Sequence, residues 1–216
     1  MKQKAWNWLA VNSQEREFWS TPSGNVFEFI LRLKQSGKSK VYDLGCGLGR
    51  HLFLLIESGF EVHGSDFSLD AVKEVNEELE KLECPNRVKH ESMTEISEQD
   101  DSYDAVIAYN VIYHSYLADM LKTFRNIHRI LKSGGYLLIT FQAKTSPIYN
   151  KDDEVEPGTI VKKYEPEAGI PHHLVDREET ISMFSDFHIL DLKYVEHEYD
   201  GMRHKGCHFV VTAVKR

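Results

Sequence analysis

The sequence lacks long apolar runs, an excess of basic residues and a cysteine framework. No segment approaches the roughly 18 consecutive apolar residues that a membrane-spanning helix needs, so we expect no membrane partner. The formal net charge of −8 argues against nucleic acid as the main partner. The three cysteines lie far apart and form neither a metal-binding pair nor a disulfide framework, which is typical of a reducing compartment.

The beginning of the chain also lacks the pattern of an export signal. Its apolar patch is short, and no small-residue cleavage site follows it. We therefore expect a cytoplasmic protein. The 216 residues suffice for one well-buried α/β domain, and we expect a monomer or a homodimer.

Predicted strands and helices alternate along most of the chain. We expect strands at 40–44, 60–65, 87–91, 104–111, 136–141, 188–195 and 206–214. We expect helices at 50–58, 68–82, 117–133 and 177–185, the third ending at the glycines of Ser133-Gly134-Gly135. This alternation predicts a mostly parallel seven-stranded sheet in a Rossmann-like three-layer α/β/α sandwich. The turn HEYDGMRHKG is too short for a crossover helix, so the last two strands should form an antiparallel hairpin at one edge.

Two segments fall outside this alternation. Residues 1–36 contain a predicted helix after Thr21-Pro22 and all three tryptophans. Residues 143–176 have little periodicity and four prolines, and they follow the carboxyl end of a strand, where open α/β sheets bind ligands. We therefore divide one domain into an N-terminal helical or lid segment (1–36), a cofactor-binding core (37–142), a lid or substrate loop (143–176) and a C-terminal helix with a hairpin (177–216).

The stretch VYDLGCGLGR places glycines at 45, 47 and 49 between a strand and a helix. Such a turn lets a ligand approach bare backbone and the unpaired N–H groups of a helix N-terminus. The next strand ends at Asp66, whose carboxylate could accept both hydroxyls of a ribose. The alternative is that Asp66 only caps the following helix.

The spacing of the glycines bears on the cofactor. A dinucleotide-binding turn reads G-x-G-x-x-G, but here Gly49 comes one position early and Arg50 stands where the third glycine should be. Asp43 would repel a pyrophosphate and suits a ligand with an ammonium group. A nicotinamide-dependent oxidoreductase is therefore the weaker hypothesis, and a non-catalytic cofactor-binding module stays open.

With these motifs, the chain resembles the class I S-adenosylmethionine-dependent methyltransferases. VYDLGCGLGR is similar to their first motif, VHGSDFS to their second strand, SYDAVIAYNVIYH to their fourth and LKSGGYLLIT to their fifth. The resemblance covers residues 40–142 and implies S-adenosylmethionine as the cofactor and S-adenosylhomocysteine as the product. The cofactor-binding residues that it implies are Asp43, Gly45, Cys46, Gly47, Gly49, Arg50, Asp66, Phe67, Ser92, Met93, Tyr109 and Asn110.

The methyl acceptor is less well specified. Enzymes that methylate nucleic acid bases typically carry a DPPY-like run after the fourth strand, and its prolines are missing here. We therefore expect a small-molecule acceptor. The chain also resembles, more loosely, the small methyltransferases of the tellurite-resistance type. An acceptor aligned with the methyl group could need a general base.

We take Tyr113, His114 and His173 as catalytic candidates, and Trp19 and His172 as substrate contacts. His114 could equally cap the next helix, and the adjacent His172 and His173 could simply lie in an exposed loop. We expect no metal site, because adjacent histidines rarely share one ion and no carboxylate is spaced to join them.

Overall fold

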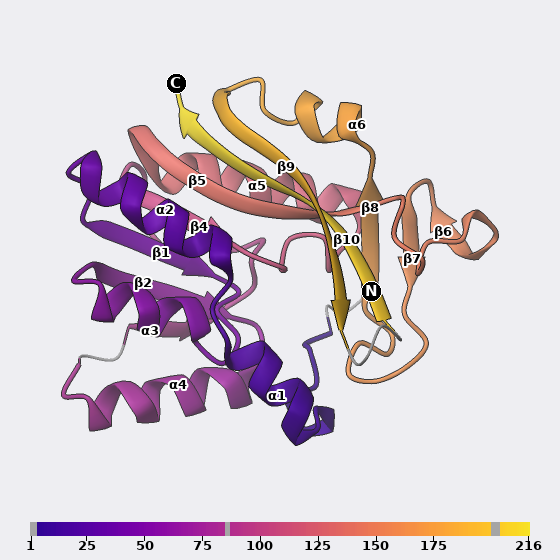
Figure 1. Ribbon diagram of the computed structural model, residues 1–216, viewed down its shortest axis with the longest axis horizontal. Coiled ribbons are helices and arrows are strands. Elements are labelled where there is room, and N and C mark those ends of the chain that lie inside the picture. The colour runs from indigo at the N-terminus through magenta and orange to yellow at the C-terminus, as the bar shows by residue number, and fades with distance from the viewer. Residues whose placement is uncertain (1–3, 85–86, 200–203) are drawn as a thin grey trace.

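The computed structural model describes residues 4–84, 87–199 and 204–216 (Figure 1). The α-helices are α1 (Ser13–Ser20), α2 (Gly24–Gln35), α3 (Arg50–Glu57), α4 (Leu69–Lys81), α5 (Leu117–Ile130) and α6 (Arg177–Ser182). The strands are β1 (Lys40–Leu44), β2 (Glu61–Asp66), β3 (Val88–His90), β4 (Tyr103–Ala108), β5 (Leu131–Ala143), β6 (Glu154–Glu156), β7 (Thr159–Val161), β8 (Pro171–Val175), β9 (Phe187–Tyr199) and β10 (His204–Lys215). Short 3₁₀ helices occupy Trp8–Ala10 and Lys151–Asp153.

The strands of the described residues form one mixed sheet. Strands β3, β2, β1, β4 and β5 are neighbours in that order and run parallel. The long hairpin of β9 and β10 adds antiparallel to β5, which confirms the predicted hairpin, although its turn (200–203) lies outside the described residues. The carboxyl ends of β1, β2 and β4 therefore meet at one edge, where open α/β sheets bind ligands.

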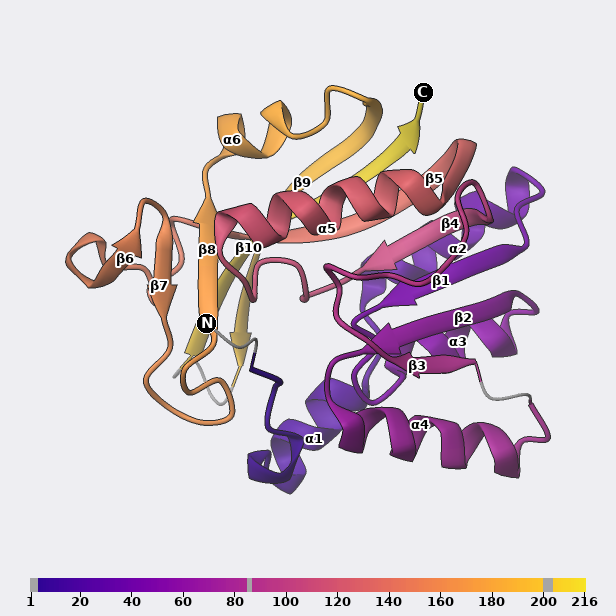
Figure 2. The ribbon, with the colours of Figure 1, turned by 180° about the vertical axis from the view of Figure 1, so that it is seen from behind.

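Helices cover both faces of the sheet and so produce the predicted three layers (Figures 1 and 2). One face packs the apolar sides of α2, α3 and α4 against the strands, with Leu33, Leu52 and Leu79 fully buried. The other face packs α5 and the segment after α6, with Met120 and Phe187 buried. In the described residues, no helix combines the length and apolar character needed to cross a membrane.

The sheet has ten strands rather than seven. The three additional strands, β6 to β8, lie within 143–176, the segment whose sequence shows little periodicity. β8 pairs parallel with Gln142 and Ala143 at the end of β5. It lies on the side of β5 opposite β10, the same side as β4, whose pairing with β5 ends at Ile139. β8 is thereby placed beside the exit of β4, and the N–H of His173 donates to the carbonyl of Tyr113 (2.9 Å).

The junction of α5 and β5 also differs from the prediction. The helix ends at Ile130 rather than at Ser133–Gly135, and Leu131 already pairs with Tyr103 in the sheet. The pairing of β4 with β5 is irregular after Leu131 and resumes at Tyr136, which pairs with Ala105. Leu131 is fully buried, so its burial against β4 outweighs the C-capping preference of the glycines.

Candidate functional site

The glycine turn follows β1 in the conformation that only glycine adopts readily. Gly45 and Gly47 have φ of +66° and +54°, and the N–H groups of Gly45 and Cys46 donate to the carbonyl of Ser65 (2.8 and 3.0 Å). A Cβ on Gly45 would lie 2.2 Å from Cγ2 of Val111. Both the backbone and the neighbouring loop therefore require glycine here.

Asp66 ties the tip of β2 to this turn. Its Oδ2 accepts the N–H of Gly47 (2.8 Å) and its Oδ1 accepts the N–H of Ser68 (2.8 Å). Burial raises the pKa of Asp66, although these N–H donors oppose the shift. Each oxygen keeps a further lone pair, and Asp66 lines the pocket, so the carboxylate remains able to accept hydroxyl groups from a ligand.

Asp43 is a buried acid with one oxygen that lacks a hydrogen-bond donor. The side chain is 2% exposed, and its Oδ2 is buried without a hydrogen-bond partner. Burial raises the pKa of Asp43 to about 7, Arg50 opposes the shift, and Asp66 adds to it. A buried carboxylate without a donor costs free energy unless a cation or a donor from outside completes it.

The pocket occupies the edge where β1, β2 and β4 end. Eleven of the predicted site residues line it: Trp19, Gly45, Cys46, Gly47, Arg50, Asp66, Phe67, Met93, Tyr109, Asn110 and His114. Six others do not: Asp43, Gly49, Ser92, Tyr113, His172 and His173. Gly49 instead caps α3 with a φ of +82°, and the hydroxyl of Ser92 is hydrogen-bonded to that of Thr94 (2.9 Å).

Several pocket residues were missed in the sequence. Glu91 was placed inside the third strand, but β3 ends at His90, so Glu91 projects from the strand tip and lines the pocket. Its Oε1 accepts the hydroxyl of Tyr42 (2.9 Å). Its position directly after a strand was the available signal. Trp6, Trp8 and His51 also line the pocket, and no periodicity points to the two tryptophans.

The N-terminal segment covers the pocket with aromatic rings. Trp6 packs against Trp8 and Trp19, with ring centroids 5.6 and 5.4 Å apart. Trp8 lies on the glycine turn, since a Cβ on Gly47 would be 2.8 Å from its ring. The Arg50 guanidinium lies over the ring of Trp19 (5.3 Å). A ligand on the turn would therefore touch these side chains.

The other end of the pocket is formed by histidines. The ring of His114 stacks on that of Trp6 (5.6 Å) and lies 4.6 Å from that of His172. Burial, followed by the neighbouring His172, lowers the pKa of His114 to about 3. His114 is therefore neutral at pH 7 and a weak base.

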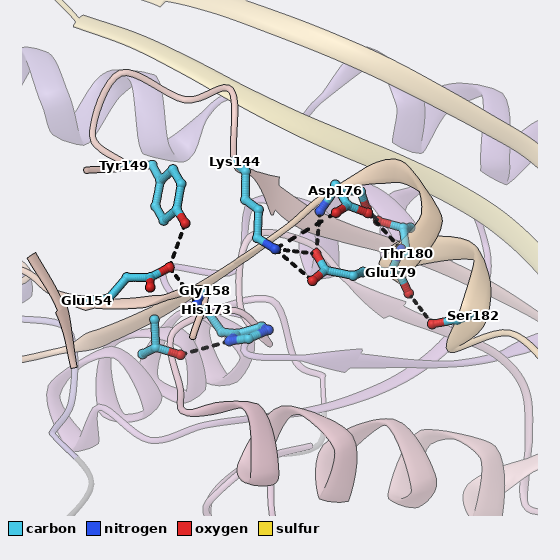
Figure 3. A network of polar contacts seen from close by, with 10 residues as sticks. Lys144, Tyr149, Glu154, Gly158, His173, Asp176, Glu179, Thr180 and Ser182 are labelled. Atoms are coloured by element: carbon cyan, nitrogen blue, oxygen red, sulfur yellow. Dashed lines mark hydrogen bonds and ion pairs between the residues drawn. The ribbon is translucent and has the colours of Figure 1, made fainter. Parts of the chain in front are cut away.

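His172 and His173 point in opposite directions, because successive side chains alternate across a strand. His172 is 1% exposed and lies near His114, with its Nδ1 2.9 Å from Oε1 of Gln142. His173 instead bonds the hydroxyl of Thr159 (2.8 Å), next to the polar network of Lys144 and Glu179 (Figure 3). The geometry therefore corrects the expectation for His173, and His172 is the member of the pair beside the pocket.

Tyr113 also points away from the pocket lining, with its hydroxyl 3.2 Å from Nε2 of His208. Among the described residues, the structure gathers one group that could hold a metal ion: His114, Glu167 and His172, whose ligand atoms lie within 4.8 Å of one another. The sequence argument against a metal site rested on the adjacency of His172 and His173 and on the lack of a carboxylate spaced to join them. In the structure, Glu167 comes from a loop and lies near His114 and His172.

Residues 41–135 match the profile of a family described as a methyltransferase domain. The chain is 30% identical over 136 residues to the glycine/sarcosine N-methyltransferase of Aphanothece halophytica, covering 62% of this chain and 48% of that protein. It is 30% identical over 114 residues to phosphoethanolamine N-methyltransferase 3 of Arabidopsis thaliana, covering 52% and 23%. The matched parts thus span less than half the length of these relatives.

The fold is also found among solved structures. TehB from Haemophilus influenzae superposes with a TM-score of 0.69 at 20% identity, covering 90% of this chain and 63% of that one. The sequence match lies on the strands and turns that carry the glycines, Asp43 and Asp66. Residues 41–135 therefore match a methyltransferase domain, and the chain is similar in fold to TehB.

Proposed function

We propose that the protein transfers a methyl group from S-adenosylmethionine to the nitrogen of a small-molecule acceptor. The observation that carries this proposal is the buried, unpartnered carboxylate oxygen of Asp43 beside the glycine turn. A ligand ammonium would supply the missing donor, directly or through water. A pyrophosphate would instead add negative charge next to Asp43 and Asp66, which disfavours a nicotinamide cofactor.

The residues at the strand tips fit the rest of this cofactor. Gly45 and Gly47 leave bare backbone for the methionine part, Asp66 offers free lone pairs to the ribose, and Phe67 offers a ring to the adenine. Glu91 is a further acceptor near the adenine end. When bound, S-adenosylmethionine supplies a methyl group already activated by its sulfonium, so the task left to the chain is alignment and exclusion of water.

Two observations support a small amine as the acceptor. The relatives named above are N-methyltransferases of glycine, sarcosine and phosphoethanolamine. In addition, the aromatic rings of Trp6 and Trp19 line the pocket, and ring faces stabilise cations such as a methylated ammonium product. We assign His114 to acceptor contact rather than to proton removal, because its pKa is low.

Calorimetric titration with S-adenosylhomocysteine and with NADH tests the cofactor. We expect 1:1 binding of S-adenosylhomocysteine and its loss in Asp66→Ala, with His63→Gln as a control on the same strand but outside the pocket lining. Binding of NADH alone would contradict the proposal. Release of S-adenosylhomocysteine on incubation with a panel of small amines then tests transfer, and cofactor binding without turnover of any amine would favour a non-catalytic module.

A further inference from the structure

A carboxylate oxygen and two imidazole nitrogens meet beside the pocket. Nε2 of His172 lies 3.0 Å from Oε1 of Glu167, and Nε2 of His114 lies 3.7 Å from the same oxygen. His172 belongs to β8, whereas His114 and Glu167 belong to the loops that follow β4 and precede β8. Of the three residues, His114 lines the pocket, so the cluster is adjacent to the space where a ligand would bind.

The orientation of His172 directs one ring nitrogen at the carboxylate of Glu167. Its Nδ1 lies 2.9 Å from the amide oxygen of Gln142, which only accepts, so Nδ1 carries the proton of the neutral ring. Nε2 then carries the lone pair and faces Oε1 of Glu167. This nitrogen is buried, and it lies at ion-pair distance from Oε1 of Glu167 but is not aligned for a hydrogen bond with it. Two facing lone pairs repel unless a cation lies between them or the ring is protonated.

Neighbouring side chains hold the cluster in this arrangement. Nζ of Lys162 lies 3.1 Å from Oε2 of Glu167 and thereby leaves Oε1 directed to the histidines. The Gln142 amide orients His172 in the same way, and such outer partners are typical of metal ligands. The N–H of Asn7 donates to the carbonyl of Pro166 (3.1 Å), so the N-terminal segment holds the loop that carries Glu167.

The distances are close to those in a zinc site. Zinc bonds to histidine nitrogen and carboxylate oxygen are about 2.0 to 2.2 Å long, so tetrahedral ligands lie about 3.3 to 3.6 Å apart. The observed separations of 3.0 and 3.7 Å fall on either side of this range. All three ligand atoms lie within 4.8 Å of one another, so shifts of the side chains would bring them to the spacing of a zinc site.

We propose that His114, Glu167 and His172 bind one divalent metal ion of the zinc class beside the acceptor end of the pocket. Three protein ligands leave a coordination position open, as in catalytic rather than structural zinc sites. The site itself rests on these side chains alone, whereas its role rests on the proposed function. An amine bound to the ion would lose its free lone pair, so the ion anchors an anionic oxygen of the acceptor, from a carboxylate or a phosphate.

Metal binding to the full chain tests the site. The protein is stripped with a chelator and titrated with Zn²⁺ by calorimetry and with Co²⁺ by visible absorption. We expect one equivalent of each ion and the intense d–d bands of a four-coordinate Co²⁺ site. Because loss of an outer partner costs about 10- to 100-fold in metal affinity, His172→Gln and Glu167→Gln should each weaken binding by more than about 100-fold.

His173→Gln is the matched control, since it removes the adjacent histidine of the same strand, which bonds Thr159 instead. S-adenosylhomocysteine binding, measured on each variant, shows that it is folded. Absence of saturable 1:1 metal binding, or equal binding in the Glu167→Gln and His173→Gln proteins, would overturn the site. If S-adenosylhomocysteine still binds, only this proposal fails; if it does not bind the unmodified chain, the proposed function fails.

Acetate and inorganic phosphate titrated into the zinc-loaded protein test the role of the ion. Zinc-dependent binding of one anion supports the role and identifies its source as a carboxylate or a phosphate. Binding of neither anion, or equal binding without zinc, would overturn the role as an anchor.

Discussion

Asp43 is held in an unfavourable environment that a ligand can relieve. The carboxyl is buried next to Asp66, and Arg50 is the cation that opposes the shift of its pKa to about 7. Because this folded-state pKa is raised above its usual value, the native state holds the proton longer than the unfolded chain does. Without a ligand, the Asp43 contribution therefore lowers stability as pH rises from about 4 to about 7.

Cofactor affinity should change in the opposite direction. Since only ionised Asp43 attracts an ammonium, the Kd of S-adenosylhomocysteine should be about tenfold higher at pH 6 than at pH 8. Calorimetry across this range measures the effect. Asp43→Asn should bind more weakly at pH 8 and lose most of the pH dependence. The same pH slope in this variant would show that another group is responsible.

The N-terminal segment and α1 cover the carboxyl edge of the sheet and bring three aromatic side chains to the pocket (Figure 2). Trp8 and Trp19 contact the glycine turn and Arg50, the residues that also carry the cofactor motif. At the scale of elements, the described part of residues 1–36 therefore contributes directly to the candidate site. β8 does the same from the other side by placing His172 next to His114.

Every tryptophan of the chain lines the pocket, so intrinsic fluorescence should report ligand binding. Saturable quenching or a shift of the emission is expected on addition of S-adenosylhomocysteine, with the Kd found by calorimetry. Asp66→Ala should show no change at the same ligand concentration. Unchanged emission in a protein that demonstrably binds the ligand would contradict the contact between this segment and the cofactor.

At the scale of the whole molecule, one sheet connects all parts of the proposed site. β5 pairs with β4, β8 and β10, so the glycine turn, the histidine cluster and the C-terminal hairpin are attached to one sheet. We therefore propose that 143–176, which contains β6 to β8, is an integral part of the domain that can still serve as a substrate loop. A chain built in this way should unfold as a unit.

Thermal unfolding tests this expectation. A single transition is expected, and S-adenosylhomocysteine at 100 times its Kd should stabilise the protein by about 2.7 kcal/mol, which corresponds to about 5 to 10 °C in Tm for a domain of this size. Two transitions, of which only one moves with ligand, would instead show that the segments fold separately.

Local patterns predicted the elements whose signal is local. β1 has the predicted bounds, and α3 starts at Arg50 as predicted, because apolar alternation and the glycine turn are encoded within a few residues. The strands β6 and β7, each three residues long, are too short to show a period. They pair with each other, and β7 also pairs with β8, which in turn pairs with the distant end of β5.

The gathering of the glycine turn, Asp43 and Asp66 follows from the sequence alone, since they stand at or near the ends of strands that must meet at one edge of a parallel sheet. The arrangement of the histidines beside the pocket was decided only by the tertiary structure. Strand alternation sends His172 toward His114 and His173 away, and a loop without periodicity brings Glu167 to both His114 and His172. Such contacts join residues far apart in the chain, and no spacing in the sequence encodes them.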